Sequence, residues 1–292
     1  MPLSDAKSIV PIFAGGGTRL PAHIGILAAL SELDVQFSHI VGVSGGSIVS
    51  ALYASGMNVE QIKSIAMNTD FEKFKGFSLL SLLRHGGLSS GDKFEAWIDK
   101  LLNGVTFSQL PIQLHIVATD VRSGSPVVFD AKTSPDEKVS RAVRFSMSIP
   151  LIFSFKPYKD YLMVDGSILS EDALHQDWAA NGTSVICFRL RGDNDTKPLE
   201  TNGMFPIAAY ISLLIRTFMT TISREYVSDK FWHQTIVVET GNTSPVDFHL
   251  NSQDKLRLYE IGYRTALDIV PKKFLDVQSN VQILDGQDFS LL

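Results

Sequence analysis

Residues 41–47 constrain this chain more than any other stretch, because they read Val-Gly-Val-Ser-Gly-Gly-Ser between two apolar segments. The run 37–43 predicts a strand, and the run 48–54 predicts a helix. A strand that turns sharply into a helix at a G-x-S-x-G sequence is typical of a nucleophile elbow. Such a turn would lift the Ser44 hydroxyl out of the sheet and place it at the positive end of the helix dipole.

Glycines surround the serine on this predicted turn. Gly42, Gly45 and Gly46 bring no side chains into a tight and strained backbone. The same residues fit a second interpretation, in which the serine only caps the helix N-terminus on a glycine-rich turn. The motif by itself leaves both interpretations open, so the partners of Ser44 elsewhere in the chain decide between them.

A second glycine-rich turn comes earlier in the chain. It follows a predicted strand at 8–14, precedes a predicted helix at 22–33, and consists of Gly15, Gly16, Gly17, Thr18 and Arg19. A dinucleotide-binding fingerprint would need a small residue in place of Leu20 and an acidic residue after the second strand. Both are missing, which argues against a nucleotide site. The alternative is that the glycine N–H groups converge on an oxygen anion beside the elbow.

Predicted strands and helices alternate along the chain, which favours a three-layer α/β/α sandwich around a mostly parallel central sheet. Pro11 predicts that the first strand lies near an edge of the sheet, because proline lacks the N–H that an interior strand donates. Later helices are expected at 173–180, 204–227 and 254–270. No linker or internal repeat interrupts the pattern, so we expect one catalytic domain over residues 1–292. Its core motifs span about 9–190, and residues 191–292 form a more helical C-terminal part.

Composition excludes several classes of function. The 292 residues carry 26 basic and 31 acidic side chains, a net charge of −5, so no surface for nucleic acid is expected. The single cysteine, Cys187, forms no intramolecular disulfide, and no spacing of His and Cys is typical of zinc. The chain before Ile9 does not resemble a signal peptide, and the longest apolar stretch, 205–219, is shorter than the ~20 residues that span a bilayer. We therefore expect a soluble, cytoplasmic protein whose membrane contact, if any, is peripheral.

A serine hydroxyl is a weak nucleophile and needs a neighbouring base. Among the seven histidines, His249 comes late in the chain beside Asp247, where the histidine of an α/β hydrolase is expected. The other candidate is Asp165, which follows a predicted strand at 161–164, and open α/β sheets place ligand sites at strand ends. Gly166 allows a tight turn after it. A surface histidine and a turn aspartate are the ordinary interpretations, so these residues alone leave the base open.

Five motifs occur in the order of the patatin-like phospholipase family, and the chain from about 12 to 180 resembles that family. The matching segments are the glycine loop 15–19, the elbow 42–47, Ala118–Val121 with Gly124 and Phe129, Ser146–Phe153 with its Ile149-Pro150 turn, and Asp165-Gly166. Leu20 stands where the family usually has glycine, and Ser167 stands where it has glycine or alanine. Neither departure removes a catalytic side chain, but Leu20 puts the fit of the glycine loop in doubt.

The resemblance implies a serine lipid acyl hydrolase that acts on glycerophospholipids without a metal or cofactor. The implied site residues are Ser44 as nucleophile, Asp165 as base, and Gly15, Gly16, Gly17 and Arg19 as the oxyanion loop, with every histidine structural. In this site Arg19 would hold the loop or a phosphate; the ordinary interpretation is a solvated charge at the start of a helix. A lysophospholipase, a general carboxylesterase and a signal-activated effector, for example a nucleotide-gated one, are the alternatives. Nothing in the sequence specifies the acyl position, the head group, an activator or the oligomeric state.

Residues 71–88 carry more apolar side chains than a solvated loop needs. The segment also holds three basic residues and three glycines that would act as hinges, Lys73, Lys75, Arg84, Gly76, Gly86 and Gly87. An apolar surface edged by cations suits the membrane interface. One interpretation is therefore a lid that covers the acyl groove in water and opens on phospholipid. The other interpretation is that these side chains pack against the core.

Overall fold

The computed structural model describes residues 8–74, 76, 84, 86–168, 174–192, 210, 214, 217 and 229–285. Its central sheet has the strand order β10-β9-β1-β2-β4-β8-β7, and β5 pairs with β4 beside this path. The parallel strands are β10 (Thr235–Glu239), β9 (Val185–Arg191), β1 (Val10–Ala14), β2 (His39–Val43) and β4 (Gln113–Asp120). The antiparallel ones are β5 (Ser125–Phe129), β7 (Lys156–Tyr158) and β8 (Tyr161–Val164).

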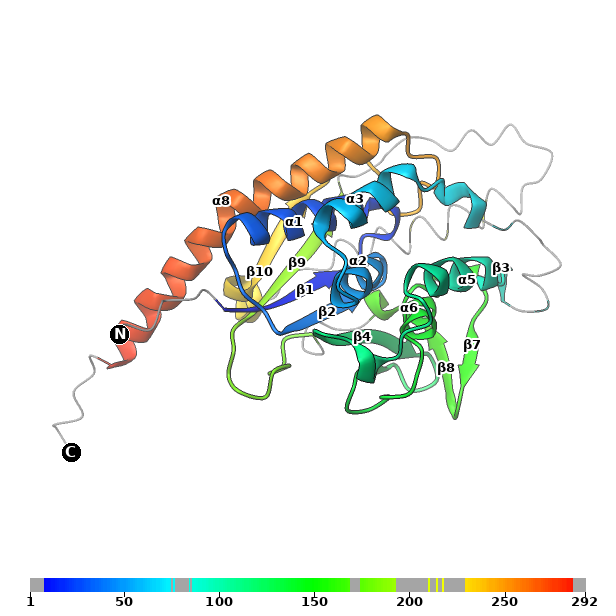
Figure 1. Ribbon diagram of the computed structural model, residues 1–292, viewed down its shortest axis with the longest axis horizontal. Coiled ribbons are helices and arrows are strands. Elements are labelled where there is room, and N and C mark those ends of the chain that lie inside the picture. Colours follow the sequence, from blue (N-terminus) through cyan, green and yellow to red (C-terminus); the bar gives the residue numbers. More distant parts are fainter. Residues whose placement is uncertain are drawn as a thin grey trace.

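Helices flank this sheet, so the predicted α/β fold with a mostly parallel sheet is confirmed (Figure 1). They are α1 (Pro21–Glu32), α2 (Gly45–Ala54), α3 (Val59–Asn68), α5 (Asp92–Leu101), α6 (Val139–Ser146) and α8 (Ser252–Asp285). Figure 1 shows α1, α3 and α8 on the same side of the sheet. A small parallel pair, β3 (Gly87–Ser89) with β6 (Leu151–Phe153), lies outside the central sheet.

Helices α1 and α8 meet at two glycines, and this close packing holds the start of α1 in place. A Cβ on Gly25 would lie 2.0 Å from the Tyr259 carbonyl oxygen, and one on Gly262 would lie 2.0 Å from the Ala22 carbonyl oxygen. Neither position therefore tolerates a side chain without separating the helices. The glycine loop enters α1 directly, so the α1–α8 contact also positions the loop.

The strands that carry the site are covered on both faces. Every residue of β1 is buried, and so are seven of the eight residues of β4, as is typical of strands between two layers. One face contributes Phe13 and Ile40 to the core that includes α1, α2 and α8. The other face packs against Leu174 and Trp178. Water is thereby excluded from the middle of the sheet.

Two local predictions are wrong. Pro11 is not near an edge, because β1 lies between β9 and β2. The β1–β2 register begins at Ile12, so the missing N–H of Pro11 falls before that ladder. Residues 174–180 form turns and bends instead of the predicted helix 173–180. Trp178 packs there onto the sheet and its indole N–H donates to the Leu174 carbonyl at 2.7 Å, so tertiary packing overrides the helical pattern.

The C-terminal part agrees only in outline with the prediction. The last helix is longer than the predicted 254–270, because α8 continues past Pro271 to Asp285. The predicted helix 204–227 lies outside the described residues except for Tyr210, Leu214 and Thr217, which are helical. None of the helices in the described ranges is both long and apolar enough to cross a bilayer.

Segment 71–88 is described only in part. Phe71 and Phe74 are buried in a short 3-10 helix, Phe71–Phe74, and Leu88 is buried in β3. These side chains pack into the core, as the second interpretation of the segment expects. Residues 77–83, which hold the remaining apolar side chains of the predicted lid, lie outside the described residues.

Candidate active site

Ser44 lies on the turn between β2 and α2, where the G-x-S-x-G pattern predicts it. Its backbone has φ 52° and ψ −126°, values that a residue with a side chain rarely adopts. The neighbouring positions must be glycine because there is no room there for a side chain. A Cβ on Gly42 would lie 2.6 Å from Cα of Ser47, and one on Gly46 would lie 2.1 Å from the Phe13 carbonyl oxygen. The sequence therefore folds into a strained turn that presents a hydroxyl at the N-terminus of α2.

The Ser44 hydroxyl donates a hydrogen bond to Oδ2 of Asp165 at 2.7 Å. Both residues are buried, with exposed fractions of 0% and 1%. Strand β8 delivers Asp165, but it runs antiparallel to β4, so the sheet-edge rule for parallel strands does not explain this position. Gly166 follows without a side chain because a Cβ there would lie 2.2 Å from the Val117 carbonyl oxygen.

Three further hydrogen bonds hold Asp165 in this place. Its N–H donates to the Ser148 carbonyl at 3.1 Å, and its carbonyl accepts from Oγ1 of Thr119 at 3.1 Å. Its Oδ1 accepts from the Ser167 N–H at 2.8 Å, which leaves Oδ2 directed at the serine. The carboxyl group is thus oriented by backbone and side chain together.

The charge of Asp165 depends on its burial. Burial raises the pKa of Asp165 from 3.8 to about 6, although the hydrogen bonds from Ser167 and Ser44 partly oppose that shift. The carboxyl group therefore changes its charge near neutral pH, as a general base requires. At pH 7 the carboxyl group is therefore mostly ionised.

The C-terminal end of α6 also contacts Ser44. Oγ of Ser146 accepts from the Ser44 N–H at 2.8 Å and donates to the Val117 carbonyl at 2.7 Å. Sδ of Met147 lies 3.8 Å from the Ser44 Oγ. The sequence identifies 146–153 as a motif, but it gives these side chains no role, because only the folded chain brings them to the elbow.

The glycine loop packs against the elbow. The N–H of Gly15 donates to the Val43 carbonyl at 3.1 Å, so this group is not free to bind an oxyanion as the sequence suggests. The N–H groups of Gly16 and Gly17 donate to no other group in the described parts of the chain. A Cβ on Gly45 would lie 2.7 Å from the nitrogen of Gly17, which places that nitrogen beside the first residue of α2.

A distant segment of the chain closes over this loop. The Pro245 carbonyl accepts from the N–H of Thr18 at 2.9 Å and from its Oγ1 at 3.2 Å. Gly17 has φ 53°, and a Cβ on it would lie 2.0 Å from the same Pro245 oxygen. Any side chain at Gly17 would therefore force the loop to move.

Arg19 lies under the loop, with 1% of its surface exposed. Its Nε donates to the Gly16 carbonyl at 3.3 Å. Its other guanidinium nitrogens donate to Oγ1 of Thr240 at 3.0 Å and to the Leu190 carbonyl at 3.3 Å. Burial lowers the pKa of Arg19 to about 10, so it is a cation at pH 7. Its burial contradicts the interpretation of Arg19 as a solvated charge, and its contacts fit the role in which Arg19 holds the loop.

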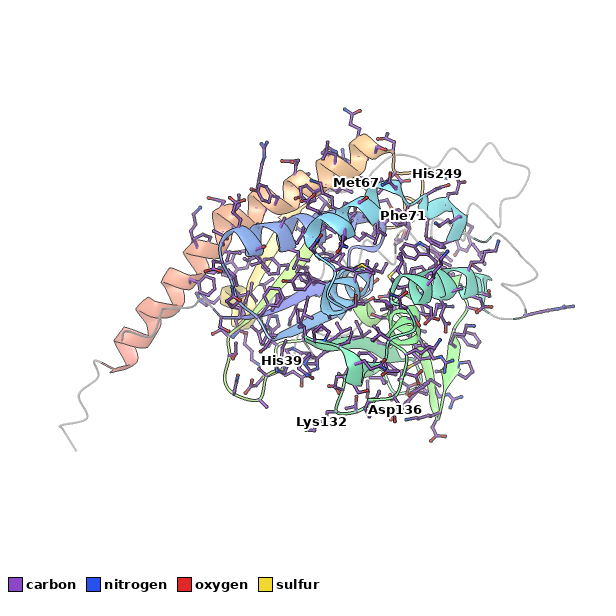
Figure 2. All side chains as sticks on the ribbon, in the orientation of Figure 1. His39, Met67, Phe71, Lys132, Asp136 and His249 are labelled. Carbon is purple, nitrogen blue, oxygen red and sulfur yellow. The ribbon has the colours of Figure 1, made fainter. Side chains whose placement is uncertain are left out.

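The described histidines form no hydrogen bond with Ser44 or Asp165. His249 pairs with Glu72 at 3.3 Å and lies near the upper edge of the molecule in Figure 2. His39 lies near the lower edge in that view, and a hydrogen bond of 3.0 Å joins it to His115. These positions favour Asp165 over a histidine as the base of Ser44.

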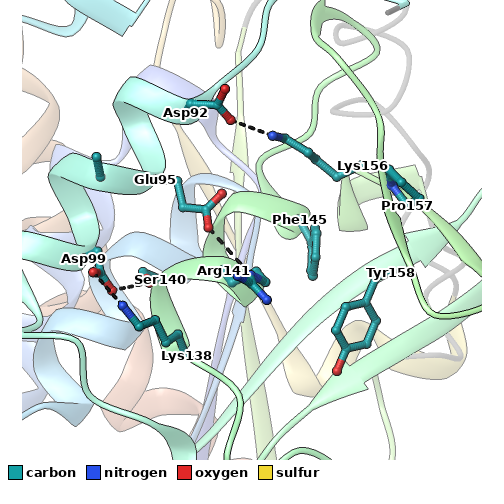
Figure 3. A pocket seen from close by; sticks show the side chains of 11 residues that line it. Asp92, Glu95, Asp99, Lys138, Ser140, Arg141, Phe145, Lys156, Pro157 and Tyr158 are labelled. Atoms are coloured by element: carbon teal, nitrogen blue, oxygen red, sulfur yellow. Dashed lines mark hydrogen bonds and ion pairs between the residues drawn. The ribbon is translucent and has the colours of Figure 1, made fainter.

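A separate open pocket of about 540 Å³ lies between α5, α6 and β7 (Figure 3). Neither Ser44 nor Asp165 lines it. Its charged side chains form ion pairs across the opening, Asp92 with Lys156, Glu95 with Arg141 and Asp99 with Lys138. Because these charges are already paired, we assign no ligand to this pocket.

The sheet, the strained turn and the buried serine and aspartate define an α/β protein with a candidate site in which a serine hydroxyl donates to a carboxylate. The family model described as patatin-like phospholipase matches residues 12–178 of this chain. The chain belongs to the patatin-like phospholipase family, which places it among lipid ester hydrolases. The predicted resemblance to that family is confirmed.

Relatives match most of this chain. Over 280 residues this chain is 28% identical to the uncharacterized protein YqhO of Bacillus subtilis. The alignment covers 87% of this chain and 94% of YqhO. Over 270 residues it is 26% identical to an uncharacterized protein of Acanthamoeba polyphaga mimivirus, covering 87% of this chain and 90% of that protein. An uncharacterized NTE family protein of Mycobacterium tuberculosis is 27% identical, with 73% of this chain matching 35% of that protein.

Solved structures share the fold. VipD from Legionella pneumophila superposes with a TM-score of 0.59 at 13% identity, covering 91% of this chain and 67% of VipD. ExoU from Pseudomonas aeruginosa, in its complex with SpcU, superposes with a TM-score of 0.54 at 18% identity, covering 93% of this chain and 53% of that one. At these identities the likeness shows the fold alone.

Proposed function

We propose that this protein is a serine lipid acyl hydrolase that cleaves carboxylic ester bonds of glycerophospholipids through Ser44 and Asp165. The observation that carries this proposal is the 2.7 Å hydrogen bond from the hydroxyl on the strained turn to the buried carboxylate. Membership of the family supports a lipid ester as substrate. The geometry of the pair supports a covalent route through the serine.

In the first half of the reaction, Oγ of Ser44 attacks the ester carbonyl carbon while Oδ2 of Asp165 accepts the hydroxyl proton. Negative charge then develops on the carbonyl oxygen, where the N–H groups of Gly16 and Gly17 and the N-terminus of α2 stabilise it. The bond to the leaving alcohol breaks, Asp165 returns its proton to that oxygen, and the acyl group remains on the serine.

In the second half, water attacks the acyl carbon and gives its proton to Asp165. The bond to Oγ of Ser44 breaks, the proton returns to Oγ, and the fatty acid leaves. Because Ser44 and Asp165 are buried, an ester reaches them only after covering side chains move. Met147 is one of these, since its sulfur lies 3.8 Å from the Ser44 Oγ.

The direct test uses the purified chain and vesicles of diacyl phosphatidylcholine. Free fatty acid is expected to appear, and the Ser44→Ala variant is expected to release none. Mass spectrometry of the products then identifies which ester bond is cleaved. A strong preference for lysophospholipids or soluble short-chain esters would favour the alternative enzymes. Failure to cleave any ester, together with nucleotide binding that survives Ser44→Ala, would refute the hydrolase.

The reaction should depend on pH through Asp165. Because burial raises the pKa of that carboxyl to about 6, kcat/KM is expected to be maximal above pH 7. Below about pH 5 it should fall by about tenfold per pH unit, since only the ionised form accepts the serine proton. The measurement is hydrolysis of a soluble ester between pH 4.5 and 8. A profile that stays flat down to pH 4.5 would contradict a base with this pKa.

A further inference from the structure

The candidate oxyanion site is built from two peptide units whose carbonyl oxygens are each held by two donors. The Gly16 carbonyl accepts from the N–H of Arg19 at 2.9 Å and from its Nε at 3.3 Å. The Gly15 carbonyl accepts from the Gly46 N–H at 3.1 Å and lies 3.1 Å from Nε2 of His23. A trans peptide points its C=O and its N–H in opposite directions. Holding the Gly15 oxygen therefore fixes the direction of the Gly16 N–H, and holding the Gly16 oxygen fixes the direction of the Gly17 N–H. Each N–H points away from the oxygen of its own peptide unit.

We propose that His23 is a positioning residue that aims the Gly16 N–H at the oxyanion, an inference that rests on the proposed function. The peptide between Gly15 and Gly16 needs such a restraint because both glycines have positive φ, 69° and 99°. Glycine on both sides lets a peptide unit rotate with little steric cost. Two groups restrain the Gly15 carbonyl oxygen: the Gly46 N–H, which belongs to α2, and the His23 side chain, which belongs to α1.

The protonation of His23 follows from its surroundings. Its side chain is fully buried, and burial lowers its pKa to about 3, so the ring is neutral at pH 7. A neutral imidazole carries one N–H, and the Gly15 carbonyl can only accept. The proton is therefore on Nε2, and His23 donates it to Gly15. This leaves Nδ1 as an acceptor inside the protein.

That second nitrogen has no hydrogen-bond partner among the described residues. A buried acceptor without a partner destabilises a folded protein, so histidine is a poor residue for packing alone at this position. The ring of Phe13 lies edge-on at 5.3 Å between centroids, and a phenylalanine at position 23 would keep an aromatic ring beside it. The donor on Nε2 is what histidine adds there.

The His23→Phe variant separates positioning from packing. It keeps an aromatic ring beside Phe13, removes the donor to Gly15 and removes the unpartnered Nδ1. We expect kcat to fall about 10- to 100-fold with KM nearly unchanged, less than the full loss of an oxyanion donor because Gly46 still holds the oxygen. The melting temperature is expected to stay equal or rise, whereas loss of a purely structural hydrogen bond would lower it. An unchanged kcat would overturn the inference.

Two more variants complete the test. His23→Gln retains an amide N–H that reaches toward Gly15 and is expected to restore most of kcat; no restoration would count against a donor role. Ile24→Val is the matched control, because Ile24 is also fully buried in α1 but has no donor. It is expected to lower the melting temperature without lowering kcat.

A crystal structure of His23→Phe tests the inference without any substrate. The peptide between Gly15 and Gly16 is expected in a second orientation, alone or mixed with the first. A single unchanged orientation would overturn the role of His23. Failure of the wild-type chain to cleave esters would instead refute the proposed function, so the two failures are distinguishable.

Discussion

Asp165→Asn is expected to lower kcat/KM for ester hydrolysis by about 10⁴-fold or more. Asparagine keeps the shape of the side chain and still accepts the Ser167 N–H, but its amide cannot take the proton from Ser44. Ser44→Ala should lose as much activity. The double variant should lose no more than either single one, because the two groups act as a unit. Initial rates on a soluble ester and on phospholipid vesicles provide the measurement.

Stability gives a control for this first prediction. The pKa of Asp165 is about 6 in the folded protein and 3.8 ordinarily, so the folded state holds the proton more tightly between these pH values. The free energy of unfolding therefore falls as pH rises through this window, by roughly 3 kcal/mol at pH 7. Asp165→Asn carries no charge, so it should melt at a higher temperature than the wild type at pH 7.

The opposite pattern would identify a different base. If Asp165→Asn hydrolysed esters at a normal rate while replacement of one histidine abolished hydrolysis, the reaction would run through a triad. A lower melting temperature of Asp165→Asn at pH 7 would show that its hydrogen bonds outweigh the burial of its charge.

Gly17→Ala is expected to produce the next largest loss, about 10²- to 10³-fold in kcat, with a lower melting temperature. The new Cβ would lie 2.0 Å from the Pro245 carbonyl oxygen at a backbone φ of 53°. The loop must move to relieve this contact, and the Gly17 N–H then leaves the oxyanion. Steady-state kinetics should show the loss in kcat more than in KM.

Gly124→Ala is the matched control for that prediction. Gly124 also has a positive φ, 69°, but nothing lies within 4 Å of the position of a Cβ there. It should lower stability slightly and leave kcat unchanged. Gly16→Ala should be intermediate: at φ 99° its Cβ would lie 2.7 Å from the end of the Leu190 side chain and 3.4 Å from Nε2 of His23, and these side chains can give way more easily than the Pro245 backbone. A normal kcat in Gly17→Ala, with weaker nucleotide binding, would support the nucleotide alternative instead.

The elbow could be predicted from the sequence because its determinants are local. Ser44 and its glycines lie within a few residues of one another, and the strand before and the helix after them follow from short apolar runs. The glycines are needed because this tight turn leaves no room for a Cβ at Gly42 or Gly46. The order of the five motifs along the chain was sufficient to identify the family. The placement of Pro11 could not be predicted, since it depends on which strands become its neighbours.

The sequence also suggests Asp165 as one of two candidate bases, but it cannot place the aspartate beside Ser44. That contact joins positions 121 residues apart and depends on β8 running antiparallel to β4. Ser146 and Met147 were missed for the same reason. Their pattern in the sequence is only the end of a helix, and no local signal marks the atoms that they meet.

The sequence by itself determined the serine turn, the glycine loop and the strands and helices that flank them, because each depends on residues that are neighbours in the chain. The tertiary structure decided what each group of the loop does. It uses the Gly15 N–H in the contact with Val43, and it brings Pro245 to Thr18 across 227 positions. It also buries His23 against the Gly15 carbonyl. The direction of a peptide unit depends on what holds its oxygen, and those partners come together only when the sheet and helices pack.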